Sequence, residues 1–239
     1  MSTELVRVEA VTKKYAELTA VDKVSLHVDA GEVYALVGAN GAGKSTLIRI
    51  LAGIVAADEG KVLIEGEDLI ARAPHLKRRI GYLPEELFLY NRLSGREYLR
   101  LVAGLKDANA NDVAAEVDFF ELSLIADKWI GGYSLGMRKK LGLAAAMLGR
   151  PDLLVLDEPL NGLDVEMMRG LRDRIETVRA EGRAVLLSSH VMSFVELIAD
   201  RVGIMCGGHL VAEGSPQELR ERAALENASF EDVFFKLAN

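Results

Sequence analysis

Residues 33–45, which read VYALVGANGAGKS, decide the fold of this 239-residue chain. The apolar run at 33–37 is typical of a strand that is buried on both faces of a parallel sheet. Residues 38–45 fit the pattern G-x-x-x-x-G-K-[ST]. The segment 47–53, LIRILAG, then has helical spacing and stops at Gly53. A strand, a glycine-rich loop and a helix in direct succession predict a loop that wraps phosphate groups.

The residue types of this loop suit phosphate binding. Glycines allow backbone N–H groups to approach phosphate oxygens without a side chain in the way. Lys44 is expected to place its charge on the β- and γ-phosphates of a nucleotide, and the Ser45 hydroxyl is expected to ligate Mg²⁺. The alternative, a surface turn with an exposed lysine, is disfavoured by the order of strand, loop and helix. The residues predicted to contact the nucleotide are Gly38, Asn40, Gly41, Ala42, Gly43, Lys44, Ser45 and Thr46.

A second motif follows a later apolar strand. Residues 153–156 read LLVL, and Asp157 and Glu158 come directly after them. Such a strand delivers these acids to the carboxyl edge of the sheet, where open α/β folds bind ligands. We expect Asp157 to hold Mg²⁺ through water, and Glu158 to orient or deprotonate an attacking water molecule.

The rest of the chain alternates strands with helices, which indicates a mostly parallel α/β sheet. Residues up to about 70 favour strands, residues 89–150 are rich in helix formers, and 202–212 favour a hairpin. We expect one domain over 1–239. Its catalytic core comprises 1–88 and 151–215, its helical subdomain is 89–150, and a C-terminal helix over 216–239 begins at Pro216.

Composition excludes several classes of protein. The chain has 29 Lys and Arg against 36 Asp and Glu, a net charge of −7, which argues against nucleic-acid binding by bulk charge. The N-terminus carries no signal-peptide pattern, and no apolar stretch approaches the roughly 18 residues of a membrane span. The single cysteine, Cys206, excludes an intramolecular disulfide and a cysteine-cluster zinc site, and we expect it to be a buried small hydrophobe.

Four further segments narrow the range of protein families that fit this sequence. They are YSLGM at 133–137, PLNGLD at 159–164, SSH at 188–190 and KKY at 13–15. Together with the two motifs above, their order and spacing resemble those of the ATP-binding subunit of an ABC transporter over residues 4–215. The segments 165–171 and 229–237 are most similar to ATPases of the ABC-2 exporter branch. The resemblance implies a P-loop NTPase core with a mostly parallel sheet, an N-terminal antiparallel β subdomain and an inserted α-helical subdomain.

The resemblance also implies roles for individual residues. Tyr15 would stack on adenine, unless it is a core or edge-strand tyrosine. Ser134 and Gly136 would contact the γ-phosphate bound by the other protomer. Asp164 would act across the dimer interface, or else only cap a helix, and His190 would bond the γ-phosphate and place the attacking water. The other three histidines match no family motif and are expected to be structural.

This sequence departs from the family pattern at two sites. Leu135 and Met137 replace the third and fifth residues of the usual Leu-Ser-Gly-Gly-Gln signature, which removes a side-chain amide. Glu85 stands where a glutamine is expected. Because a carboxylate cannot donate a hydrogen bond and is repelled by a phosphate, we expect Glu85 to face the metal directly or through water. Glu86 is a weaker candidate for that place.

The resemblance implies ATP and Mg²⁺ as cofactors, and ATP hydrolysis in a head-to-tail dimer, either a homodimer or a pair of ABC subunits. Its partners would be integral membrane permease subunits, which would hold the chain at the cytoplasmic face of the cell membrane. The apolar segment 87–90, LFLY, is the predicted docking surface, unless it packs into the helical subdomain's own core. Two other functions stay open. One is a soluble ABC-type ATPase acting on nucleic acid or the ribosome, for which the basic run 77–79 is too slight, so we expect no nucleic-acid partner. The other is a small-molecule phosphotransferase.

Overall fold

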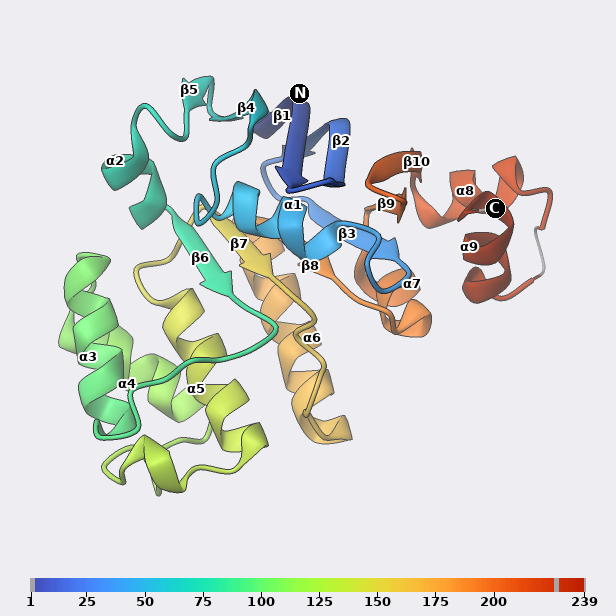
Figure 1. Ribbon diagram of the computed structural model, residues 1–239. Coiled ribbons are helices and arrows are strands. Elements are labelled where there is room, and N and C mark those ends of the chain that lie inside the picture. The colour runs from blue at the N-terminus through green and yellow to red at the C-terminus, as the bar shows by residue number, and fades with distance from the viewer. Residues whose placement is uncertain (1–2, 226–227, 239) are drawn as a thin grey trace.

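The computed structural model describes residues 3–225 and 228–238. Its centre is a six-stranded sheet in the order β10-β9-β3-β8-β7-β6, in which only β10 pairs antiparallel (Figure 1). The sequence prediction of a mostly parallel sheet is therefore confirmed. The strands are β3 (Val33–Gly38), β6 (Ile80–Leu83), β7 (Leu153–Leu156), β8 (Ala184–Ser188), β9 (Arg201–Cys206) and β10 (His209–Gly214).

The strand order explains why distant motifs meet. β8 lies between β3 and β7 and pairs in parallel with both. The phosphate loop follows β3, the acidic pair follows β7, and His190 follows β8 closely. Because parallel strands end at the same edge of a sheet, all three segments reach one edge. Every residue of β3, β7 and β8 is buried, as their continuous apolar runs predict.

A second, antiparallel sheet forms the N-terminal β subdomain. Its order is β2-β1-β4-β5, with β1 (Glu4–Tyr15), β2 (Leu18–Asp29), β4 (Glu59–Ile64) and β5 (Glu67–Asp68). One apolar cluster joins this sheet to α1 (Lys44–Leu51) and to one face of the central sheet. The short helix α2 (Ala73–Arg78) leads from this sheet to β6. The phosphate loop is therefore backed by both sheets.

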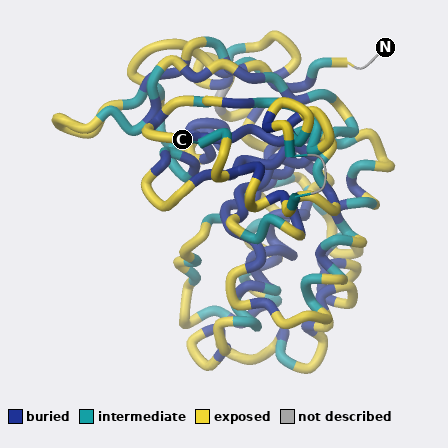
Figure 2. The backbone as a smooth tube through the Cα atoms, turned by 90° about the vertical axis from the view of Figure 1, so that its right-hand side faces the viewer, coloured by how far each residue is buried: buried dark blue, intermediate teal, exposed yellow. Residues whose placement is uncertain are grey.

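Three α-helices form the inserted subdomain: α3 (Gly95–Leu105), α4 (Ala110–Phe119) and α5 (Leu135–Met147). Ser94 and Asn109 begin α3 and α4 with capping boxes, so these helix starts are encoded locally. Figure 2 shows this subdomain as a lobe with buried residues along its inner side, continuous with the centre of the molecule. A single apolar cluster runs from α3, α4 and α5 into the other face of the central sheet. The lobe and the sheet thus share one core.

The C-terminal part differs from the sequence prediction. After α6 (Val165–Ala180) and α7 (Met192–Ile198), the expected single helix over 216–239 is two helices, α8 (Pro216–Arg222) and α9 (Phe230–Ala238). The first helix ends at Arg222, just before Ala224, whose φ of +51° is not helical. Ser229 then precedes the second helix, and its hydroxyl accepts a hydrogen bond from the backbone N–H of Asp232, as a helix-starting residue does. Residues 226, 227 and 239 of the expected helix lie outside the described residues.

Cys206 corrects another expectation, because its side chain is exposed and not buried. Ile204 and Met205 before it are both fully buried, so β9 is covered on both faces, and this cover ends at Cys206, at the turn into β10. Among the described residues, no helix has both the length and the apolar character to cross a bilayer.

Candidate functional site

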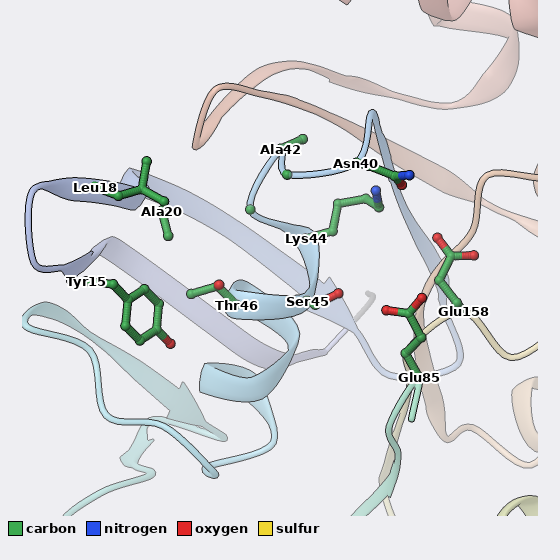
Figure 3. Close-up of a pocket in the computed structure, with 12 residues that line it drawn as sticks. Tyr15, Leu18, Ala20, Asn40, Ala42, Lys44, Ser45, Thr46, Glu85 and Glu158 are labelled. Carbon is green, nitrogen blue, oxygen red and sulfur yellow. The ribbon is translucent and has the colours of Figure 1, made fainter. Parts of the chain in front are cut away.

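A cavity of about 400 Å³ lies between the phosphate loop, the end of β1 and the two acids Glu85 and Glu158 (Figure 3). Tyr15 lies at one end of the cavity and the acids at the other, with Lys44, Ser45 and Thr46 between them. A second cavity of about 480 Å³ shares Asn40, Glu85 and Glu158 with the first. Its lining adds Gly38, Ala39, Asn161, His190, Met192, Glu231, Phe234 and Phe235. The structure therefore brings the predicted phosphate, base and adenine residues to one place.

The phosphate loop is open toward the first of these two cavities. Gly43 precedes α1 with φ +102°, and a Cβ there would lie 2.3 Å from the carbonyl oxygen of Ala20, so only glycine fits. Gly41 has φ +81°, and a Cβ there would meet nothing within 4 Å. No side chain caps the N-terminus of α1. The first N–H groups of α1 and the positive end of its dipole are therefore available to an anion.

Lys44 is buried and holds the loop in shape. Its Nζ donates hydrogen bonds to the carbonyl oxygens of Gly38, at 2.7 Å, and Ala39, at 3.2 Å. An ammonium group has three N–H donors, so these two bonds leave one for a further acceptor. Lys44 thus lies in the wall of the cavity, in the loop that is predicted to bind the phosphates.

Asp157 lies beneath the cavity and is fully buried. Its Oδ1 accepts hydrogen bonds from Ser45 Oγ at 3.1 Å and Ser188 Oγ at 2.7 Å. Its other oxygen, Oδ2, is buried and has no hydrogen-bond partner. Burial first, and then the charge of Asp157, raise the pKa of the half-buried Tyr82. A buried carboxylate oxygen without a partner is costly, and a cation beside it would remove that cost.

Glu158 is held in place by its backbone and by its side chain. Its backbone N–H donates to Ser188 Oγ at 2.9 Å, and its Oε2 lies 2.9 Å from Nδ1 of His190. An ionised carboxylate only accepts, so Nδ1 carries the proton in this contact. Glu85 lines the cavity beside it, at the far end of the cavity from Tyr15 (Figure 3).

Two residues of the site were missed at the sequence level. Ser188 bonds both Asp157 and the backbone of Glu158, and Lys139 donates from Nζ to the Glu158 carbonyl oxygen at 3.0 Å. Ser188 could have been found, because it ends a buried strand beside the acidic one. Lys139 could not, because Lys140 is its neighbour and only packing tells which of the two points inward. Lys139 is 2% exposed.

Tyr15 is 44% exposed, so it is not a core residue. It ends β1 opposite Leu18, and both side chains line the cavity. The Nζ of Lys13 lies 5.6 Å from the centroid of the Tyr15 ring. A partly exposed ring at the mouth of a cavity is a surface on which a planar base can stack.

Ser134, Gly136 and Asp164 do not line either cavity. Ser134 begins α5, and its hydroxyl accepts a hydrogen bond from the backbone N–H of Met137 at 3.3 Å. Asp164 begins α6 in the same manner, accepting from the N–H of Met167 at 2.8 Å. Both are helix caps within the chain, and the exposed Leu135 and Val165 beside them mark this as surface.

Comparisons with known proteins agree with this geometry. Residues 21–161 match the family model described as "ABC transporter". The lantibiotic transport ATP-binding protein SrtF of Streptococcus pyogenes is 34% identical over 209 residues, which cover 87% of this chain and 90% of SrtF. The Nod factor export ATP-binding protein I of Burkholderia thailandensis is 36% identical over 225 residues, 92% of this chain and 74% of that protein. A solved ATP-binding subunit of an ABC transporter superimposes with a TM-score of 0.92 at 30% identity, covering 98% and 100% of the two chains.

Proposed function

This chain belongs to the ABC transporter family and is a transport-coupled, ATP-hydrolysing subunit; from that premise we propose that it powers export through membrane subunits as one half of a head-to-tail dimer. The observation that carries the proposal is the cavity that has the phosphate loop on one side and Glu158 on the other. The names of the two relatives, one a lantibiotic transporter and one an exporter, favour export. They do not favour the alternative of an ATPase acting on nucleic acid or the ribosome.

ATP would lie along the cavity. Its base would stack on Tyr15, and its phosphates would be held by the N–H groups of residues 38–46 and by Lys44. Lys44 can keep its two bonds to the loop carbonyls, because its third N–H is left to donate to a phosphate oxygen. This bond would be strong because both groups are charged.

Mg²⁺ fits the donor set below the loop. Among the described residues, no three His, Cys, Asp or Glu side chains could hold a metal by themselves. Mg²⁺, however, is commonly bound by one or two protein oxygens together with phosphates and water. The Ser45 hydroxyl and the unpartnered Oδ2 of Asp157 are such oxygens, and we assign Glu85 to the same ion directly or through water. The ion would neutralise the charge on the β- and γ-phosphates.

Glu158 would act as the general base. It takes a proton from water, the water oxygen attacks the γ-phosphorus, and the bond from that phosphorus to the bridging oxygen breaks to give ADP and phosphate. His190 holds the Glu158 carboxylate at 2.9 Å and reaches the cavity that contains Glu85 and Asn40. His190 would orient that water, and it would bond the γ-phosphate through Nε2 if that nitrogen also carries a proton.

A second protomer would complete the site. Ser134 and Gly136 lie outside the two cavities described above, at the start of a helix whose N-terminus is at the surface. A helix N-terminus favours anions, and in a head-to-tail pair it would reach the γ-phosphate of the other copy, with Asp164 at the same interface. Loss of that phosphate would release the two chains.

The test is the variant Glu158→Gln in the full-length chain. ATP turnover should fall by two orders of magnitude or more, since the amide cannot accept the proton. ATP binding should persist, and size-exclusion chromatography with light scattering should detect a dimer when ATP and Mg²⁺ are present. The matched control Glu176→Gln removes the charge of a half-exposed acid on α6 that pairs with Arg179 across the helix surface. Turnover of Glu158→Gln at the wild-type rate would refute the base assignment.

A further inference from the structure

The backbone of Glu158 adopts a conformation that it would not choose by itself. Its φ is +46°, in the left-handed region that residues other than glycine rarely occupy. Such a conformation persists only where the surroundings hold it. Because the direction of the side chain follows from the backbone, whatever holds this conformation also aims the carboxylate.

The backbone N–H of Asn161, close by in the chain, donates to the Glu158 carbonyl oxygen at 3.3 Å. Three further contacts hold Glu158, and they come from other parts of the fold. Ser188, at the end of β8, accepts from its backbone N–H, and His190 contacts its carboxylate. The third contact is Lys139 Nζ, which donates to its carbonyl oxygen at 3.0 Å. Lys139 belongs to α5, in the helical subdomain, so this bond reaches from the subdomain to the base.

Lys139 is also a buried positive charge next to negative ones. Its side chain is almost fully enclosed, and burial lowers its pKa. The charges of Asp157, Glu85 and Glu158 act in the opposite direction and favour the ammonium form. Three carboxylates near the phosphate-binding loop repel one another, and a cation behind them reduces that repulsion. Glu85 adds one of these negative charges, at the position where the resemblance leads one to expect a neutral glutamine.

We propose that Lys139 is a positioning residue for hydrolysis: it fixes the carbonyl of Glu158 so that the carboxylate points into the cavity, and its charge offsets Glu85. The proposal rests on the base role assigned to Glu158. It also gives α5 a second task, because the helix that carries Lys139 begins at Ser134. A partner's nucleotide that engages the Ser134 end would act, through one helix, on the base of this chain's own site.

The principal test compares Lys139→Met with Lys140→Met in the full-length chain. Methionine keeps the length of the side chain and removes its charge and donors. The adjacent Lys140 serves as the control, because it bonds Glu121 at the surface. Lys139→Met should lower kcat about tenfold or more and leave KM and the Kd of a fluorescent ATP analogue within about twofold. Lys140→Met should match wild type. Lys139→Arg, which keeps charge and donors, should recover part of the lost kcat.

Two double variants separate this role from a merely structural one. In a Glu158→Gln background, Lys139→Met should cost little further turnover, because it acts through the residue already removed. In a Glu85→Gln background, Lys139→Met should lower kcat by a smaller factor than in the wild type, because one of the repelling charges is gone. If Lys139→Met lowers kcat by the same factor in the wild type, in Glu158→Gln and in Glu85→Gln, the proposal is wrong.

The outcomes also separate this inference from the proposed function. Wild-type turnover of Glu158→Gln would refute the base role itself. Loss of turnover in Glu158→Gln with full kcat in Lys139→Met would refute only the role of Lys139. If Lys139→Met does not fold, Lys139→Gln replaces it, because its amide still donates but carries no charge. Lys139→Gln should have intermediate kcat, and wild-type kcat in that variant would equally overturn the inference.

Discussion

Asp58 anchors the end of β1, where Tyr15 stands. Its Oδ1 accepts from Lys13 Nζ at 2.8 Å, and its Oδ2 accepts from the backbone N–H of Lys14 at 2.7 Å. Lys13 in turn lies over the Tyr15 ring. These contacts join a loop of the antiparallel sheet to the residue that we assign to adenine, so a change at Asp58 should affect nucleotide binding more than chemistry.

We expect Asp58→Asn to raise KM for ATP by roughly twofold to fivefold with kcat nearly unchanged, because an exposed anchor is weak. Steady-state kinetics measure both values. Glu59→Gln is the control, since Glu59 pairs with the Lys14 side chain at 3.4 Å and holds no backbone group. An unchanged KM in Asp58→Asn would show that Tyr15 does not need this anchor.

The pH dependence of this anchor follows from the same contacts. The Lys13 side chain, and then the Lys14 N–H, lower the pKa of Asp58 from its ordinary value of 3.8. A carboxyl group with a lowered pKa in the folded state contributes stability above its ordinary value and loses it as the pH falls through the lowered one. The anchor should thus be complete at neutral pH and lost only below about pH 4.

Some single residues could be predicted from the neighbouring sequence, and others could not. Glu158, Asp157 and Lys44 were predicted from their motifs, because strand, loop and residue type lie within a few positions of one another. Cys206 was predicted to be buried and is exposed, because it is the last residue of β9, where the cover of the strand ends. Lys139 and Ser188 were not predicted at all.

At the scale of elements, α4 and its following residue connect the helical subdomain to the shared core. Phe120 at the C-terminal end of α4 is fully buried, whereas Phe119 beside it is 42% exposed and contacts the Arg174 guanidinium. Arg174 also forms an ion pair with the buried Glu116 of α4, which ties the subdomain to α6. Two adjacent phenylalanines therefore differ mainly in burial.

Phe120→Ala should destabilise the chain by roughly 3–5 kcal/mol, because it removes a large buried ring and leaves a cavity. Phe119→Ala should lower the free energy of unfolding by about 1 kcal/mol, because it removes the contact with Arg174. Urea unfolding of both variants measures the difference. Similar losses of stability would contradict the prediction that the burial of Phe120 makes it the more important of the two rings.

The segment 87–90 illustrates how packing divides an element. Leu87 and Leu89 are partly buried and pack against the core, while Phe88 is 88% exposed and Tyr90 is 63% exposed. The interpretation as core packing is therefore confirmed for Leu87 and Leu89, and docking stays a prediction for Phe88 and Tyr90. Only Phe88 and Tyr90 are free to serve as the docking surface.

At the scale of the whole molecule, docking onto a membrane subunit gives the final prediction. Phe88→Glu and Tyr90→Glu should weaken capture by a tagged, detergent-solubilised permease subunit about tenfold or more, because burying a large apolar ring contributes to binding and burying a charge opposes it. Leu197→Glu is the control, since Leu197 is 62% exposed on α7, which leads into β9 near the other edge of the sheet. Full capture of both variants would assign the docking surface elsewhere.

The sequence by itself determined the local parts: the buried strands, the phosphate loop, the acids after β7, the capped helices and, through resemblance, the two-subdomain plan. These depend on hydrophobic period, glycine geometry and residues close in the chain. Only the tertiary structure decided that Ser45, Asp157 and Ser188 form one hydrogen-bonded group, that Lys139 and not Lys140 reaches Glu158, and which apolar side chains stay exposed. Those outcomes depend on how elements far apart in sequence pack, and no short stretch of residues encodes that packing.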